Sequence, residues 1–258
     1  MKITVLSENS SCRHGIVAEH GLSLFIEAKG KKILFDTGAS GVFADNAAAM
    51  GIDLSLADIA VISHGHYDHG GGIRRFLEIN KNAPVYISSK GFGEYYNGKG
   101  EYIGLDKSLA ACGRLTYVYD HLELWDGMEL FSKNGEKPVA DIRPFGQREL
   151  CGGGFVSERY LHEQYLLITE GSKRVLFSGC SHKGIENITE WFKPDVLVGG
   201  FHFSKMQVGE ELFSLAKNLA SYNTRYYTCH CTGSEQLAAM GEYIKELHGI
   251  SAGSVVEL

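Results

Sequence analysis

The sequence lacks several features that would place it in a specialised class of protein. It has no basic run longer than a few residues and carries a formal net charge of -6, which argues against nucleic-acid binding through a basic face. No apolar stretch approaches the roughly 18 to 20 residues that a membrane helix needs. Six cysteines spread over 258 residues do not make a disulfide scaffold. We therefore expect a cytoplasmic protein that binds neither nucleic acid nor membrane.

The composition also excludes intrinsic disorder. Hydrophobic residues make up 44% of the chain and charged residues 22%, so a sizeable core can be buried. The short apolar run at residues 2–6 turns polar at once, which is typical of a first strand rather than a signal peptide. Neither a Pro/Ser-rich linker nor an internal repeat divides the chain, so we expect a single domain over residues 1–258.

Short strands and helices alternate along most of the chain. Residues 22–28 alternate apolar with other side chains, as in a strand that is buried mainly on one face. A turn separates them from residues 32–35, which predicts an antiparallel hairpin. Residues 89–160, rich in glycine, tyrosine and charge, are interpreted as a central insertion. Further strands are predicted at 2–6, 58–62, 84–87, 115–119, 128–132, 139–143, 164–169, 173–178, 195–199 and 225–228, and helices at 40–50, 72–79, 183–192, 209–220 and 234–247.

The strongest chemical signal follows the apolar segment 58–62 directly. His64, His66, Asp68 and His69 fall within six residues. Imidazoles and carboxylates are ligands of zinc and similar metals, and so dense a cluster rarely arises in a loop whose histidines are merely exposed. On a strand, His64 and His66 point the same way, while a following turn directs Asp68 and His69 to a second point nearby. The segment therefore predicts two adjacent metals.

This H-x-H-x-D-H motif resembles the signature of the metallo-β-lactamase superfamily. Residues 35–38 resemble its early D-T-G element, residues 176–180 resemble the strand that ends in a metal-bridging aspartate, and residues 228–233 resemble its late histidine motif. The resemblance extends over nearly the whole fold and is weakest in the central insertion. It implies an α+β fold, the four-layer αββα sandwich with two mostly antiparallel sheets, and a metal-dependent hydrolase that attacks its substrate with a metal-activated water.

Four shorter strings resemble one branch of that superfamily, the dihydropterin-6-ylmethyl-(ribofuranosyl)aminobenzene 5'-phosphate synthase-like proteins. They cover residues 19–23, 179–182, 199–202 and 229–233. The branch implies a small phosphate-bearing or pterin-like substrate. Its name also leaves open a second activity, the joining of a pterin to a phosphoribosyl-aminobenzene unit.

The chain departs from the superfamily pattern at two linked places. Position 180 is cysteine where most members have the bridging aspartate, and the histidine expected upstream of it has no clean counterpart. We expect His182 to replace that histidine and His162 to be a partly exposed strand residue. Cys180 is either a thiolate ligand, deprotonated by a nearby dication, or a small buried side chain. If the bridge is missing, a catalytically weak metal-dependent binding protein is a further alternative.

The resemblance implies ligands for two divalent cations, with zinc favoured and manganese or iron as alternatives. Asp68 is also expected to orient the nucleophile, and Asp36 to support the ligands from behind. The expected sets are His64, His66 and His182 for one metal and Asp68, His69 and His230 for the other.

The roles of the remaining candidates stay open. His202 follows a buried strand and is interpreted as a general acid, a substrate-phosphate contact, an extra ligand or a strand cap. His20 is a second substrate-binding candidate. Cys229 and Cys231 are expected to face away from His230 and to pack rather than bind metal. The expected partner is a small-molecule substrate, and the aromatic residues of the insertion would serve as a pocket wall, a lid or the contact of a homodimer.

Overall fold

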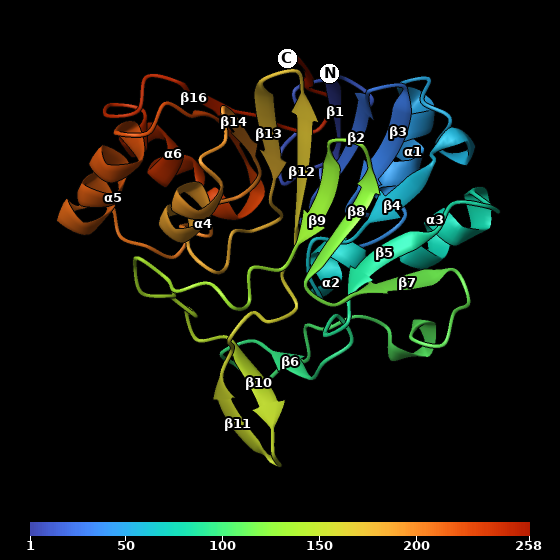
Figure 1. Cartoon of the computed structure of the whole chain (residues 1–258), viewed down its shortest axis with the longest axis horizontal. Helices are drawn as coiled ribbons and strands as arrows, with labels where there is room; N and C mark the ends of the chain where they lie inside the picture. The colour runs from blue at the N-terminus through green and yellow to red at the C-terminus, as the bar shows by residue number, and fades with distance from the viewer.

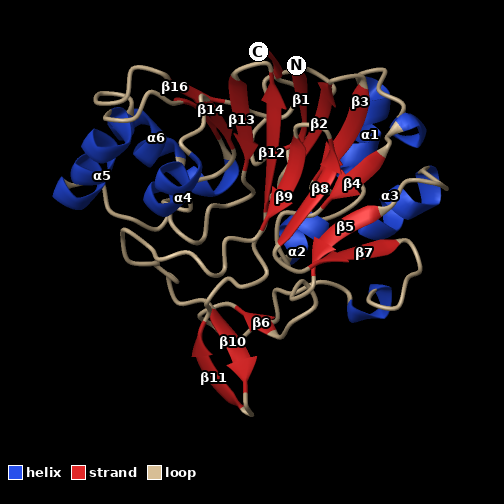
Figure 2. Cartoon of the chain, in the orientation of Figure 1, coloured by secondary structure: helices blue, strands red, loops and turns tan.

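The computed structural model describes residues 1–258 and contains two seven-stranded sheets packed face to face, with helices on both outer faces (Figures 1 and 2). The N-terminal sheet consists, in spatial order, of β17 (Val255–Glu257), β1 (Lys2–Ser7), β2 (Ser23–Ala28), β3 (Lys31–Phe35), β4 (Ile59–Val61), β5 (Val85–Ser88) and β7 (Leu115–Val118). The C-terminal sheet consists of β16 (Leu247–Gly249), β15 (Arg225–Thr228), β14 (Val196–Val198), β13 (Lys173–Phe177), β12 (Tyr165–Glu170), β9 (Met128–Phe131) and β8 (His121–Trp125).

The helices form the two outer layers of the sandwich. Those after β3 and β4 cover the N-terminal sheet, and those after β13, β14 and β15 cover the C-terminal sheet (Figure 2). The expected αββα sandwich is confirmed. The helices are α1 (Val42–Ala49), α2 (Tyr67–Gly70), α3 (Ile73–Ile79), α4 (Ile185–Phe192), α5 (Glu210–Ala220) and α6 (Ser234–Met240), with 3-10 turns η1 (Leu54–Leu56), η2 (Lys107–Leu109) and η3 (His230–Thr232).

The expectation of mostly antiparallel sheets is wrong. Strands β17, β1, β2 and β3 pair antiparallel, but β3, β4, β5 and β7 pair parallel. The C-terminal sheet repeats this division, with parallel pairing from β13 to β16 and antiparallel pairing from β13 to β8. The parallel halves follow from the helices, because a helix that covers one face of a sheet returns the chain for a strand of the same direction.

The core lies between the two sheets. Leu24 and Ile26 of β2 point into it, whereas Phe25 packs on the opposite face, under α1. The prediction that residues 22–28 form the first strand of a hairpin is confirmed. The prediction that this strand is buried mainly on one face is wrong, because helices cover its second face. Phe35 of β3 and Phe177 of β13 join the two sheets, with ring centroids 5.9 Å apart.

The segment 89–160 contributes strands to both large sheets and to a third, smaller sheet. Its strands β7, β8 and β9 belong to the two large sheets, while β6 (Tyr95–Tyr96), β10 (Arg148–Cys151) and β11 (Gly154–Ser157) form a separate three-stranded sheet. The β10–β11 hairpin projects from the lower end of the molecule in Figure 1. Residues 139–143 form no strand, contrary to the prediction.

Two further details bear on the sequence predictions. The last helix, α6, ends at Met240 rather than near 247, because Leu247 pairs with β15 as part of an edge strand. None of the helices is both long enough and apolar enough to cross a membrane.

Replacing Phe35 by alanine tests the contact between the sheets. Removing a fully buried ring leaves a cavity, so the free energy of unfolding should fall by about 3–5 kcal/mol in urea titrations of metal-free protein. Phe155→Ala is the control, because Phe155 lies on β11 and is 51% exposed. Equal effects of the two changes would contradict the proposed packing.

Candidate metal centre

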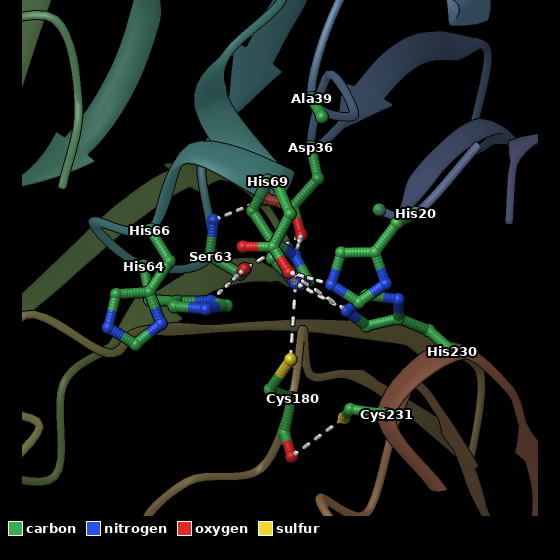
Figure 3. Close-up of polar contacts among 12 residues, drawn as sticks. His20, Asp36, Ala39, Ser63, His64, His66, His69, Cys180, His230 and Cys231 are labelled. Carbon is green, nitrogen blue, oxygen red and sulfur yellow. Dashed lines mark hydrogen bonds and ion pairs between the residues drawn. The ribbon is translucent and has the colours of Figure 1, made fainter. Parts of the chain in front are cut away.

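The site lies where the ends of several strands meet. Because β1 is parallel to β3, and β3 to β4, the residues that follow these strands reach one edge of the N-terminal sheet. The ends of β13, β14 and β15 reach the same edge of the C-terminal sheet. Figure 3 shows His64 and His66 on one side of this site, His20 and His230 on the other, and Cys180 opposite His69.

The first expected ligand set is brought together. Ligand atoms of His64, His66 and His182 lie within 4.8 Å of one another, and all three residues are buried. The Nε2 atoms of His64 and His182 are 3.2 Å apart. His182 is held there by Glu163, whose carboxylate accepts a hydrogen bond of 2.7 Å from the His182 backbone N–H.

The second expected set also converges. Asp68 Oδ2 lies 3.9 Å from His69 Nε2 and 3.3 Å from His230 Nε2, and the two imidazole nitrogens are 3.2 Å apart. Asp68 and His69 come from α2, which begins directly after His66, so a helical turn rather than a strand separates the two sets.

Buried acceptors fix the orientation of the histidines from behind. Asp36 Oδ2 lies 2.7 Å from His69 Nδ1 and accepts a 2.7 Å hydrogen bond from the Ser63 hydroxyl. Because that hydroxyl donates to Asp36, its lone pairs are free to accept from His64 Nδ1 at 2.8 Å. His69 and His64 therefore carry their protons on Nδ1 and present Nε2 lone pairs to the site.

His230, which follows β15, is also oriented by hydrogen-bond acceptors. Asn9 accepts from His230 Nδ1 at 2.8 Å through Oδ1, and Glu8 accepts from the His230 backbone N–H at 2.7 Å. The Nε2 atom of His230 thus also presents a lone pair. Both residues belong to the polar stretch after β1, which the sequence showed only as the end of a strand.

These donor sets fit divalent cations. Two lone pairs that face each other at 3.2 Å repel unless something positive lies between them, and ligands about 2.0–2.1 Å from a tetrahedral zinc ion are separated by about 3.3 Å. Burial lowers the pKa of His64 and of His182 well below the usual range, which keeps both imidazoles neutral and able to bind metal. Burial by itself would raise the pKa of Asp68. The adjacent His69 and the hydrogen bonds from His20 and His230 outweigh this effect and hold the pKa well below its usual range, so Asp68 is a carboxylate.

Cys180 occupies the centre of the site. Its Sγ lies 3.1 Å from His69 Nε2, and it forms one ligand-type group with His64 and His69 and another with His230 and Cys231. Burial raises the pKa of the Cys180 thiol well above its usual range, so only a neighbouring cation would make it a thiolate.

Cys229 and Cys231 were both expected to face away from His230 and to pack, and only one of them does so. Cys229 packs in the core between the sheets, as predicted. Cys231 instead lies beside Cys180 and His230, because the chain leaves the strand at His230 and makes the turn η3, which breaks the alternation on which the prediction rested.

The remaining histidines differ in their placement. His202 Nδ1 lies 3.1 Å from His182 Nδ1, and His20 Nε2 lies 3.3 Å from Asp68 Oδ2, so both border the ligand sets. His162 is fully buried, which overturns the expectation of a partly exposed strand residue. It accepts a 2.8 Å hydrogen bond from the Gly65 N–H and contacts Glu158.

Several site residues have left-handed backbone. Non-glycine residues adopt this conformation at a cost of about 1–3 kcal/mol, and they do so where surrounding contacts dictate their position. The φ angles of Asp36, Ser181, His202 and His230 are 60°, 56°, 57° and 53°.

A cavity of about 220 Å³ opens onto the ligand sets. Asn97 and Gln147 from the insertion and Lys205 from the loop after β14 line it together with the histidines. Lys205 also lines a neighbouring groove of about 610 Å³ that contains Arg143 and Phe145. The cavity is therefore polar, with a cation at one side.

Comparison with known proteins identifies the family. The model of the metallo-beta-lactamase superfamily matches residues 17–223. The chain belongs to this superfamily. The crystal structure of Tm1679, described as a metal-dependent hydrolase of the beta-lactamase superfamily, is 30% identical and superposes with a TM-score of 0.81 over 100% of this chain and 99% of that one.

Two other proteins mark the range of similarity. The 7,8-dihydropterin-6-methyl-4-(beta-D-ribofuranosyl)-aminobenzene-5'-phosphate synthase of Methanocaldococcus jannaschii is 27% identical over 93% of this chain and 90% of its own length. Zn(2+)-bound PqqB from Methylobacterium extorquens shares the fold, with 14% identity, full coverage of both chains and a TM-score of 0.59. The resemblance seen in the sequence is thus confirmed.

Gly179 permits the close contact between the two halves of the site. A Cβ atom there would lie 2.1 Å from Ser63 Oγ and 3.0 Å from His64 Nδ1. We predict that Gly179→Ala lowers the free energy of unfolding by about 1–3 kcal/mol, measured by urea titration, because Ser63 must move from between Asp36 and His64.

Gly154→Ala is the matched control, because a Cβ atom at Gly154 meets nothing within 4 Å. Its effect should stay within about 0.5 kcal/mol. A Gly179 variant as stable as this control would contradict the close approach.

Proposed function

We propose that this superfamily member, a metal-dependent hydrolase, cleaves a small phosphate-bearing or pterin-like molecule with two divalent cations, of which zinc is favoured. The observation that carries the proposal is the pair of ligand sets. In each set two imidazole Nε2 atoms lie 3.2 Å apart, and acceptors behind His64, His69 and His230 hold the opposite nitrogens of these rings. One cation would be held by His64, His66 and His182, and the other by Asp68, His69 and His230, with Cys180 as an additional ligand.

Cations at these positions supply Lewis-acid activation of water and neutralise negative charge that develops on the substrate. The chain's own residues position the reactants. Asp68 presents a carboxylate at the cavity wall, and His20 contacts it, which directs the Asp68 Oδ2 atom between His20 and His230. Asp68 is therefore the residue that we propose to orient the attacking water.

His202 is proposed to bind the substrate. Burial lowers the pKa of His202 to about 3, with the neighbouring His66 acting in the same direction. A neutral imidazole donates a hydrogen bond through its N–H group but is a poor source of a full proton. This favours a contact with a phosphate or leaving-group oxygen over the role of general acid.

The phosphate-bearing class is supported by the charge of the cavity. Lys205 is the cation that both the 220 Å³ cavity and the adjoining groove share. Amides of Asn97 and Gln147 offer hydrogen bonds to a polar ring, and the relative with 27% identity has a pterin and a 5'-phosphate in the name of its product.

Two alternatives have specific support. The synthase reaction is supported by the name of the same relative, and it requires release of pyrophosphate from a phosphoribosyl donor. A catalytically weak binding protein is supported by Cys180, because a thiol has one donor atom where a bridging carboxylate has two.

We predict that purified chain binds about two equivalents of Zn²⁺, measured by mass spectrometry of the metal after dialysis, and that His69→Ala retains about one. Chelation should abolish hydrolysis in a screen of phosphomonoesters, phosphodiesters and lactones, and Zn²⁺, Mn²⁺ or Fe²⁺ should restore it. Hydrolysis that survives chelation would reject the proposal, and pyrophosphate release from a phosphoribosyl donor would favour the synthase.

Lys205→Met tests the substrate class. Loss of the cation should raise KM for a phosphorylated substrate about tenfold or more while kcat changes little, because the ion pair acts on substrate binding. Metal content should equal that of wild type, since Lys205 is not among the ligand sets. Lys99→Met in the exposed loop of the insertion is the control, and an unchanged KM for Lys205→Met would exclude a phosphate contact.

A further inference from the structure

A carboxylate from the insertion reaches the metal centre. Glu158 follows β11 and is 3% exposed. Its Oε1 atom lies 2.8 Å from His66 Nε2 and 2.7 Å from His162 Nε2. The other buried carboxylate of the β10–β11 hairpin, Glu149, instead pairs with Arg159.

The hydrogen bonds determine where the protons lie. His162 accepts from the Gly65 N–H through Nδ1, so its proton is on Nε2 and is donated to Glu158. Gly65 lies between His64 and His66, and Glu158 with His162 therefore holds the backbone between two expected ligands. A carboxylate only accepts, so His66 also donates from Nε2 and keeps the lone pair of Nδ1.

A third metal at Glu158 does not explain this arrangement. Distances of 2.7 and 2.8 Å are those of hydrogen bonds and are shorter than the separation of about 3.3 Å between ligands of a tetrahedral ion. Both nitrogens of His162 are already used, one by Gly65 and the other by Glu158.

The carboxylate of Glu158 is buried with only one of its two oxygens hydrogen-bonded. Its Oε2 atom is buried and has no hydrogen-bond partner. A buried carboxylate with an unpartnered oxygen is costly and would serve poorly as a purely structural link. The cost is offset when positive charge lies close by, as it does when a cation binds to the far side of His66.

We propose that Glu158 is a positioning residue that sets the tautomer of His66 and strengthens it as a metal ligand, so that the insertion completes the metal centre. A carboxylate behind a ligating histidine fixes the ring and raises its basicity. The inference rests on the proposed function, because it requires a cation at His66.

The test compares Glu158→Met, which removes the acceptor, with Glu158→Gln, which keeps an acceptor oxygen but removes the charge. Glu149→Met is the matched control, since it removes a buried carboxylate from the same hairpin, and this carboxylate pairs with Arg159 and not with a histidine. Zn²⁺ affinity is measured by competition with a chromophoric chelator. The tautomer of His66 is measured in metal-free protein by ¹⁵N NMR of labelled histidine at one fixed pH.

We expect Glu158→Met to weaken binding of one Zn²⁺ equivalent by about 10- to 100-fold and to mix the His66 tautomers. Glu158→Gln should weaken it less and retain the Nε2–H tautomer, and Glu149→Met should match wild type. Wild-type affinity in Glu158→Met would overturn the inference alone, whereas a wild-type protein that binds no metal would reject the proposed function itself. If Glu158→Met does not fold, the wild-type spectrum decides, because an Nδ1–H tautomer of His66 contradicts the proposal.

Discussion

The buried carboxylate of Asp36 is the contact on which the rest of the site depends. It follows β3 and accepts hydrogen bonds from the Ser63 backbone, the Ser63 hydroxyl and His69. Through Ser63 it also orients His64. One side chain thus orients one histidine of each expected ligand set and joins the end of β3 to the loop after β4. Its left-handed backbone, with φ of 60°, shows that the surrounding contacts outweigh a local preference.

The buried polar groups of the site gather where several strands end. Parallel pairing places the ends of β3, β4, β13, β14 and β15 at one edge, where each strand is followed by an irregular segment. Imidazole lone pairs that face each other raise the free energy of the folded chain, and so do residues with a left-handed backbone conformation. Bound cations would offset these costs, so metal binding and folding of this edge are expected to be coupled. The large apolar cores between the sheets and under the helices supply the stability that compensates for these unfavourable contacts.

The parts of the site that the sequence predicted are those with local signals. Four expected ligands lie within six consecutive residues, His64, His66, Asp68 and His69. The motif that they form led to the resemblance from which the sandwich was predicted. Residues that act over long separations had no such signal. Glu158 bonds His66 across 92 residues and Asn9 bonds His230 across 221, and a lone glutamate or asparagine in a loop looks like any solvated residue. The misassignment of Cys231 has a different origin, because the alternation of a strand was extended past the point where η3 begins.

Cys180 bears on the choice of metal. A bridging aspartate offers two hard oxygens, one to each cation, whereas this position offers one soft sulfur beside His69. The thiol keeps its proton in the buried site until a cation within bonding distance displaces it, since burial raises its pKa. Thiolate and imidazole ligands suit zinc better than manganese, which prefers carboxylate and water. Under the proposed function, the second ligand set, which contains one carboxylate, two imidazoles and this neighbouring thiol, would suit zinc, and two cations would be linked more weakly than by a shared carboxylate.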